Sequence, residues 1–287
     1  MNEPSRHEIV ASDGQSIVSN FFPPEREAKG VVLVVPAMGT AQKYYAAFAR
    51  WLSRQGFLVV TFDYRGTGQS RSGNLREFKT DILDWARLDC SAMIDAATAA
   101  APGKPLYWIG HSLGGQILPF VPNRDRISKA VTVAAGSGYW RENSAPLRWT
   151  AWWLWFVAAP LSVRWFGYFP GKRLRKVGDL PGGVMNQWRQ WCLSPEYAVG
   201  VEADARARYA AVATPIVSLS FSDDEFMSAR NIESLHGFYV NAPKVMKRFA
   251  PEQIGVPRIG HFGFFRPGFE QSLWRDHLLP ELAPTPS

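Results

Sequence analysis

The chain has 287 residues, 46% of them hydrophobic and 20% charged, a composition that is typical of globular proteins and excludes a disordered, collagen-like or coiled-coil chain. Its 32 basic and 25 acidic residues give a net charge of +7, which is too small and too dispersed to predict a nucleic-acid partner. The two cysteines, Cys90 and Cys192, are far apart and in no cluster of metal-binding residues, which excludes a disulfide scaffold and indicates no metal site.

Short β-rich segments alternate with helical segments along the chain. The first two, Ile9–Ala11 and Ser16–Phe22, flank the turn dipeptide Asp13-Gly14 and predict an opening hairpin. The further predicted strands are Val31–Val35, Phe57–Phe62, Leu106–Ile109, Lys129–Ala134, Pro215–Phe221 and Lys244–Phe249. Apolar residues at helical spacing predict helices over Gln42–Arg54, Glu77–Ala100, Leu113–Val121, Ser228–Gly237 and Leu273–Leu279.

Strands that alternate with helices require a parallel sheet with helices on both faces, so the sequence predicts an α/β fold. We assign residues 1–136 and 214–287 to this core and residues 137–213 to an insert with no strand pattern. The insert holds eight of the 12 tryptophans and ten basic against five acidic residues, which predicts a Trp-rich, basic cap. Its segment Trp149–Val163 is apolar nearly all round, so we expect it to be deeply buried or to contact something apolar.

The same segment is only 15 residues long, shorter than the roughly 20 that cross a bilayer. The basic charge of the insert predicts at most a weak contact with an anionic membrane surface. The polar N-terminus lacks the apolar core of a secretory signal, which predicts a cytoplasmic location.

The strongest chemical signal is the motif Gly110-His111-Ser112-Leu113-Gly114-Gly115, between a predicted strand and a predicted helix. In that context G-x-S-x-G forms a sharp turn that lifts the serine hydroxyl clear of the sheet. Side chains at the flanking glycines would collide across the bend. Ser112 is therefore the candidate nucleophile, and the N–H of Leu113 at the helix start is a candidate oxyanion donor.

A serine needs a base, and His261 is the best placed of the five histidines. It follows the last predicted strand in a loop flanked by glycines, where ligand crevices of parallel sheets form. The side chain of His111 should point away from the base position, since it adjoins Ser112. We expect His7 to precede the sheet, and His236 and His277 fall in predicted helices.

A carboxylate must orient that imidazole, and the loop after Phe221 offers Asp223 and Asp224. Glu225 follows them, and we expect the acids that do not face His261 to be solvated or to cap the next helix. A second oxyanion donor should follow the strand Val31–Val35, where the N–H of Met38 is the candidate.

Two glycines before a helix in Asp63-Tyr64-Arg65-Gly66-Thr67-Gly68-Gln69-Ser70 could suggest a phosphate site. The stretch matches neither G-x-x-x-x-G-K-[ST] nor G-x-G-x-x-G, so we expect instead a structural clamp between Asp63 and Arg65.

Four stretches together resemble the α/β-hydrolase family: Asp63 to Ser70, Gly110 to Gly115, Pro215 to Ser228, and Gly260-His261-Phe262. The resemblance covers about residues 8–136 and 213–279 and implies a mostly parallel sheet of roughly eight strands with a cap at the insert. It implies Ser112 as nucleophile, His261 as base and Asp224 as acid, because the family's acid usually lies nine residues after the proline that Pro215 matches. The chain has Pro36-Ala37 where the family often has His-Gly.

The resemblance implies a serine hydrolase, and a serine at position 112 argues against epoxide hydrolases and dehalogenases, which use aspartate there. We expect cleavage of small carboxylic esters with an apolar acyl or aromatic group, because aromatic side chains line apolar pockets. An acyltransferase, thioesterase or amidase/peptidase on the same triad is the alternative, and a non-catalytic ligand-binding or membrane-surface protein is the alternative of another class. No metal or organic cofactor is implied, and the sequence gives no signal for an oligomeric state.

Overall fold

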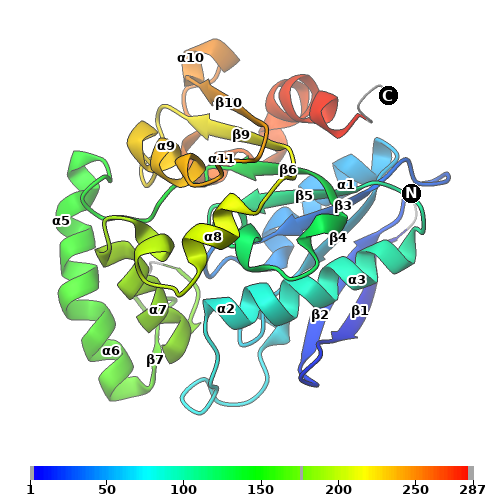
Figure 1. Cartoon of the computed structure of the whole chain (residues 1–287). Helices are drawn as coiled ribbons and strands as arrows, with labels where there is room; N and C mark the ends of the chain where they lie inside the picture. The colour runs from blue at the N-terminus through cyan, green and yellow to red at the C-terminus, as the bar shows by residue number, and fades with distance from the viewer. Residues whose placement is uncertain (1–2, 175–176, 284–287) are drawn as a thin grey trace.

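Eight strands form one mixed sheet through the middle of the molecule, with helices on both sides (Figure 1). The structure, a computed structural model, describes residues 3–174 and 177–283. The strand order is β1-β2-β4-β3-β5-β6-β9-β10; β1 and β2 pair antiparallel, β2 pairs antiparallel with β4, and all other neighbours are parallel. The strands are β1 (Ser5–Val10), β2 (Ser16–Phe22), β3 (Val31–Val35), β4 (Leu58–Phe62), β5 (Leu106–His111), β6 (Ile127–Val133), β9 (Ile216–Phe221) and β10 (Lys244–Phe249). The predicted α/β fold is confirmed.

Each face of the sheet has its own core, because successive side chains of a strand point to opposite faces. Val31, Leu33 and Val35 pack with the long helix that runs from Ile82 to Ala100. That helix comprises α2 (Ile82–Asp84), a π-helical segment (Trp85–Cys90) and α3 (Ser91–Ala100). Val32 and Val34 pack on the other face, against α1 (Ala46–Arg54) and a C-terminal π-helical segment (Glu270–Leu278).

Shorter helices and turns complete the core. The helices are α4 (Leu113–Gln116), α9 (Ala229–Gly237), α10 (Pro251–Ile254) and α11 (Gly260–Gly263). The 3₁₀ turns are at Gln42–Tyr45, Gly68–Ser70, Leu118–Phe120, Arg124–Arg126, Pro267–Phe269 and Leu279–Leu282.

Three predicted boundaries lie four or five residues from those of the structure. The first strand begins at Ser5, so His7 lies within the sheet rather than before it. The helix expected from Glu77 begins only at Ile82, because the Asp81 side chain accepts a hydrogen bond from the Asp84 N–H and caps it. The helix expected to reach Val121 ends as an α-helix at Gln116 and continues as a 3₁₀ turn, Leu118–Phe120, that contains a proline.

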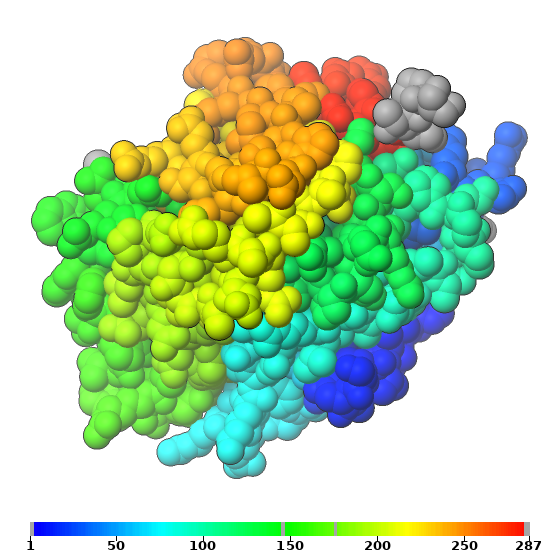
Figure 2. Space-filling model, viewed as in Figure 1, coloured from blue at the N-terminus to red at the C-terminus, as the bar shows by residue number. Residues whose placement is uncertain are grey.

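The insert between β6 and β9 is mostly helical and forms one whole side of the molecule (Figure 2). Its elements are α5 (Ala145–Trp153), a π-helical segment (Leu154–Ala158), α6 (Ala159–Phe166), β7 (Tyr168–Phe169), β8 (Leu180–Pro181), α7 (Gly182–Leu193), a 3₁₀ turn (Tyr197–Gly200) and α8 (Ala205–Ala210). The two-residue strands β7 and β8 pair antiparallel and were not predicted. Residues 145–166 form one continuous helical rod at the edge of the molecule (Figure 1). The expectation that Trp149–Val163 is deeply buried holds only in part, since Trp155 is buried and Trp149 is 81% exposed.

Candidate active site

Ser112 stands at a sharp turn directly after β5. Its φ of 49° lies in a region that residues other than glycine rarely adopt. A Cβ at Gly110 would come within 2.4 Å of the Gly114 carbonyl oxygen, and one at Gly114 within 2.2 Å of the Val35 carbonyl oxygen. Both positions therefore require glycine for steric reasons, as the motif predicts.

His261 and Asp224 are hydrogen-bonded to each other in the interior. Nδ1 of the imidazole lies 2.9 Å from Oδ2 and 3.1 Å from Oδ1 of the carboxylate, and both residues are buried. A carboxylate only accepts hydrogen bonds, so Nδ1 carries the proton and Nε2 is the free nitrogen. Asp224 Oδ1 also accepts the N–H groups of Phe226 and Met227, which fix the carboxylate in place.

The neighbouring acids also bind the histidine loop, through its backbone. Asp223 accepts hydrogen bonds from the N–H groups of Ile259 and Gly260, at 2.8 to 3.1 Å. Glu225 accepts the N–H of His261 itself, at 3.0 Å. Neither acid caps the helix that begins after Ser228, which is capped by Ser228 itself, although the Glu225 side chain is 40% exposed. The second-choice acid Asp223 does not bond to the imidazole.

A buried chain of hydrogen bonds passes through His111 and joins three loops of the site. The Ala37 N–H donates to the Tyr45 hydroxyl oxygen (2.9 Å), that hydroxyl lies 2.9 Å from His111 Nδ1, and His111 Nε2 lies 3.1 Å from the carbonyl oxygen of His261. The carbonyl can only accept, so Nε2 carries a proton. Burial holds the pKa of His111 well below its usual value, so the ring is neutral and Nδ1 accepts the Tyr45 hydroxyl proton.

The candidate oxyanion donors come from the Met38 turn and from Leu113, the residue after Ser112. Met38 and Ser112 line the same cavity, and Leu113 begins α4 immediately after the serine. Within residues 3–174 and 177–283, neither the Met38 N–H nor the Leu113 N–H has a hydrogen-bond partner. Both donors are available in the protein as it stands.

The expected Asp63–Arg65 clamp is wrong. Arg65 donates to the buried carboxylate of Asp89, at 2.6 Å, and to Asp13. Asp63 instead accepts the N–H groups of Gln42 and Gln69. The loop is held by two separate networks, and the Arg65 guanidinium is already paired with the carboxylates of Asp13 and Asp89.

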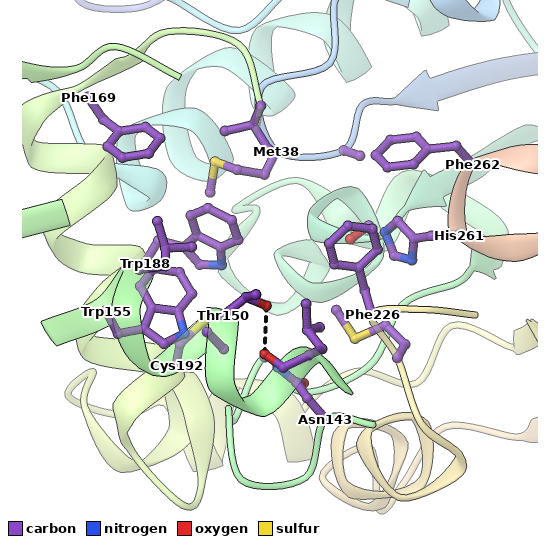
Figure 3. Close-up of a pocket in the computed structure, with 18 residues that line it drawn as sticks. Met38, Asn143, Thr150, Trp155, Phe169, Trp188, Cys192, Phe226, His261 and Phe262 are labelled. Atoms are coloured by element: carbon purple, nitrogen blue, oxygen red, sulfur yellow. Dashed lines mark hydrogen bonds between the residues drawn. The ribbon is translucent and has the colours of Figure 1, made fainter. Parts of the chain in front are cut away.

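Ser112 and His261 line one cavity of about 340 Å³ between the sheet and the insert (Figure 3). The wall is mainly apolar, and the insert supplies much of it: Leu147, Ala151, Leu154, Trp155, Phe169, Trp188 and Cys192. No group of three or more His, Cys, Asp or Glu side chains in the described parts of the chain could hold a metal ion.

Sequence reasoning missed the roles of three residues at the site. Tyr45 was counted only as a helix residue, although a tyrosine at a buried position needs a partner for its hydroxyl. Asp223 and Glu225 act on backbone groups, which leave no trace in a motif. The remaining histidines take no part: His7 is in β1, buried His236 bonds to Thr132, and His277 lies in the C-terminal helical segment.

Comparison with known proteins identifies the family. The serine aminopeptidase S33 family of hydrolases matches residues 26–177, more than half of the chain. The chain belongs to this family. The matched residues 26–177 include the Ser112 turn and the Met38 turn but not Asp224 or His261.

Individual relatives match over shorter stretches. The S33 chain is 30% identical to human monoglyceride lipase over 109 residues, which are 38% of this chain and 35% of the relative. It is 29% identical to the monoacylglycerol lipase of Mycolicibacterium smegmatis over 114 residues, 40% of each chain. The chain thus spans less than half the length of these relatives.

Solved structures of similar fold cover nearly the whole chain. A soluble variant of monoglyceride lipase from Saccharomyces cerevisiae, in complex with a substrate analogue, has a TM-score of 0.64 at 19% identity and covers 87% of this chain and 86% of its own. An esterase from Pyrococcus furiosus has a TM-score of 0.61 at 13% identity, covering 94% and 87%. At these identities the likeness establishes the α/β-hydrolase fold.

The chain of hydrogen bonds through His111 predicts that two Tyr→Phe substitutions lower the free energy of unfolding by unequal amounts. Tyr45→Phe should lower the free energy of unfolding by about 2–4 kcal/mol, because it leaves both the Ala37 N–H and His111 Nδ1 buried without a partner. Tyr209→Phe, which removes one buried hydroxyl bonded to the Gln116 carbonyl, should cost about 1 kcal/mol. Urea denaturation of both variants measures this difference, and equal costs would contradict it.

Proposed function

We propose that the protein is a serine hydrolase of carboxylic esters. The observation that carries this proposal is the Asp224–His261 hydrogen bond, which leaves His261 Nε2 free on a ring that lines the same apolar cavity as Ser112. Nε2 accepts the Ser112 proton as Oγ attacks the ester carbon, and the N–H groups of Met38 and Leu113 bind the oxyanion. His261 then gives that proton to the leaving alcohol. A water molecule, deprotonated by His261, attacks the acyl-enzyme and releases the acid and Ser112.

We propose that residues 137–213 act as the cap of this site and that the substrate carries an apolar acyl group. The insert supplies Trp155, Trp188 and Phe169 to the cavity wall, and such a wall favours an alkyl or aromatic group over a polar one. The names of the relatives support a monoacylglycerol as the ester. The described lining of the cavity includes no Asp or Glu that would bind the amino group of a peptide, which favours an ester over the aminopeptidase substrate of the family name.

Ser112→Ala tests the chemistry directly. It should lower kcat for p-nitrophenyl octanoate by about 10⁴-fold or more and abolish labelling by a fluorophosphonate probe, because the nucleophile is gone. The intact protein should be labelled on Ser112, as peptide mass spectrometry would locate. Labelling that persists in Ser112→Ala would refute the assignment.

Two other outcomes would favour the alternative functions. Tight binding of the ester by the intact protein with no turnover would favour a non-catalytic receptor. Transfer of the acyl group to an added alcohol in preference to water would favour an acyltransferase.

Substitution of each of the two neighbouring aspartates should affect kcat differently, because their roles differ. Asp224→Asn should lower kcat by about 10³- to 10⁴-fold with little change in KM, because an amide cannot hold the imidazole in the required tautomer or balance its charge. Asp223→Asn keeps an oxygen that can accept a loop N–H, so its kcat should fall by about tenfold or less. Steady-state kinetics on one ester compares the two. A loss in Asp223→Asn as large as that in Asp224→Asn would reverse the assignment.

We also propose that the insert contacts an anionic membrane surface. The outer face of the helical rod at residues 145–166 exposes seven large apolar side chains, Trp149, Trp152, Trp153, Phe156, Leu161, Trp165 and Phe166. The sequence from 143 to 178 contains six basic residues and no acidic residue. Tryptophans beside arginines and lysines are typical of helices that lie in a lipid interface. No helix in the described residues is long and apolar enough to cross a membrane.

Replacing two exposed tryptophans tests this contact. Trp149→Ser with Trp165→Ser should weaken binding to vesicles of phosphatidylglycerol and phosphatidylcholine by about tenfold or more, because less apolar area enters the interface. Vesicle sedimentation measures the binding. Val10→Ser with Val240→Ser, which removes exposed apolar side chains outside the insert, should leave it unchanged. Equal vesicle binding by the two double variants would contradict the proposal, and hydrolysis of a soluble short-chain ester should be the same in both.

A further inference from the structure

The turn that carries the candidate oxyanion donor Met38 is held both by the core and by the insert. On the core side, the Tyr64 hydroxyl donates to the Pro36 carbonyl at 3.1 Å, just before the turn. On the insert side, the Gly178 N–H donates to the Gly39 carbonyl at 3.1 Å. A backbone group of the insert therefore binds the residue that directly follows Met38.

Gly178 and Gly39 approach each other too closely for a side chain on either residue. A Cβ at Gly178 would fall 2.5 Å from the Gly39 carbonyl oxygen, and a Cβ at Gly39 would fall 2.8 Å from the Gly178 nitrogen. Gly39 also has a φ of 64°, a value that glycine adopts readily and other residues rarely. The insert thus meets this turn backbone against backbone.

The hydrogen bond from Gly178 is the first of two in a row that lead to the Met38 N–H. The peptide group between Gly39 and Thr40 accepts it and donates in turn, through the Thr40 N–H, to the Ala37 carbonyl at 3.1 Å. The Ala37 carbonyl and the Met38 N–H belong to one peptide group, and a planar trans peptide points these two groups in opposite directions. Hydrogen bonds in a chain also polarise one another. The chain therefore orients the Met38 N–H and strengthens it as a donor.

The residues on either side of Gly178 fix its place beside the cavity. The Asp179 carboxylate accepts the Lys172 N–H at 3.1 Å within the insert and Arg71 Nη1 of the core at 3.4 Å. Val177 lines the cavity together with Met38. Gly178 is thus placed by its neighbours, and its own N–H is directed at the turn.

We infer that Gly178 is a positioning residue for the oxyanion donor, acting through its N–H on the turn that carries Met38. The inference rests on the proposed ester hydrolysis, in which the Met38 N–H binds the oxyanion. It gives the insert a part in the chemical step besides its part in the cavity wall. Because the oxyanion forms only as the ester is attacked, loss of the Gly178 hydrogen bond should lower kcat and leave KM nearly unchanged.

Two alanine substitutions in the insert test this inference. Gly178→Ala displaces the Gly39 carbonyl and should lower kcat for p-nitrophenyl octanoate by about tenfold or more, since removal of a whole oxyanion donor costs about 10²- to 10³-fold. Gly183→Ala is the matched control, because its Cβ would fall 2.3 Å from the Thr80 carbonyl oxygen, an equally close contact of the insert with the core. Its kcat should stay within about twofold of that of the intact protein. Urea denaturation checks that both variants are folded.

A second variant removes the hydrogen bond without adding an atom. Glycolic acid in place of Gly178 turns the peptide N–H into an ester oxygen, and kcat should fall by about threefold or more, the factor expected of one lost hydrogen bond. This variant keeps the test available if Gly178→Ala does not fold.

An inhibitor that forms an oxyanion separates positioning from general damage. Octyl trifluoromethyl ketone adds to a serine nucleophile and leaves a negative oxygen, so its Ki should rise by the same factor by which kcat falls. Methyl octyl ketone binds without forming that oxyanion, and its Ki should not change.

Three results would overturn the inference while leaving ester hydrolysis intact. The first is a kcat in both Gly178 variants equal to that of the intact protein. The second is an equal loss of kcat in Gly178→Ala and Gly183→Ala, and the third is a rise in KM with kcat unchanged, which would give Gly178 a role in substrate binding only. Absence of ester turnover by the intact protein would instead refute the proposed function and the inference with it.

Discussion

The neutral, buried imidazole of His111 is the contact on which the arrangement of the site depends. Its two nitrogens face residues that lie 66 and 150 positions away in the sequence: Nδ1 faces Tyr45, and Nε2 faces the carbonyl of His261. Because the ring is neutral, one nitrogen must donate and the other must accept, and the surrounding partners satisfy both requirements. His111, the residue before Ser112, thus holds the histidine loop next to the Ser112 turn.

The same chain of hydrogen bonds accounts for a departure from the family pattern. The chain has Pro36-Ala37 where α/β-hydrolases often have His-Gly, yet the Ala37 N–H is held by the Tyr45 hydroxyl. That bond uses the alanine N–H, while the next N–H, of Met38, has no partner in the described chain. A hydroxyl from the first helical turn after β3 can therefore hold this backbone turn without the usual residues.

The sequence predicted most of the fold because its strands are short apolar runs separated by helical periodicity, and packing on both faces of a parallel sheet requires that pattern. Helix starts were less predictable, since the cap at Asp81 competes with an apolar pattern that begins earlier. Local motifs could indicate Ser112 and His261 as candidates. The partners of Asp223, Glu225 and Tyr45 could not be predicted, because they are backbone groups or lie up to 66 positions away.

The tryptophans of the insert lie in two kinds of place, in the cavity wall and on the outer surface. A helix that packs against a core on one side normally carries polar residues on the other. The rod at residues 145–166 instead places Trp155 in the cavity wall and Trp149 in the open, so apolar side chains occur on both faces. Burial in the protein explains only the apolar side chains of the inner face, such as Trp155. The outer set adds nothing to the core, and an exposed apolar patch of this kind is typical of a surface that binds a partner or a membrane. In the function that we propose, the inner face of this helix lines the site for an apolar ester and the outer face contacts lipid.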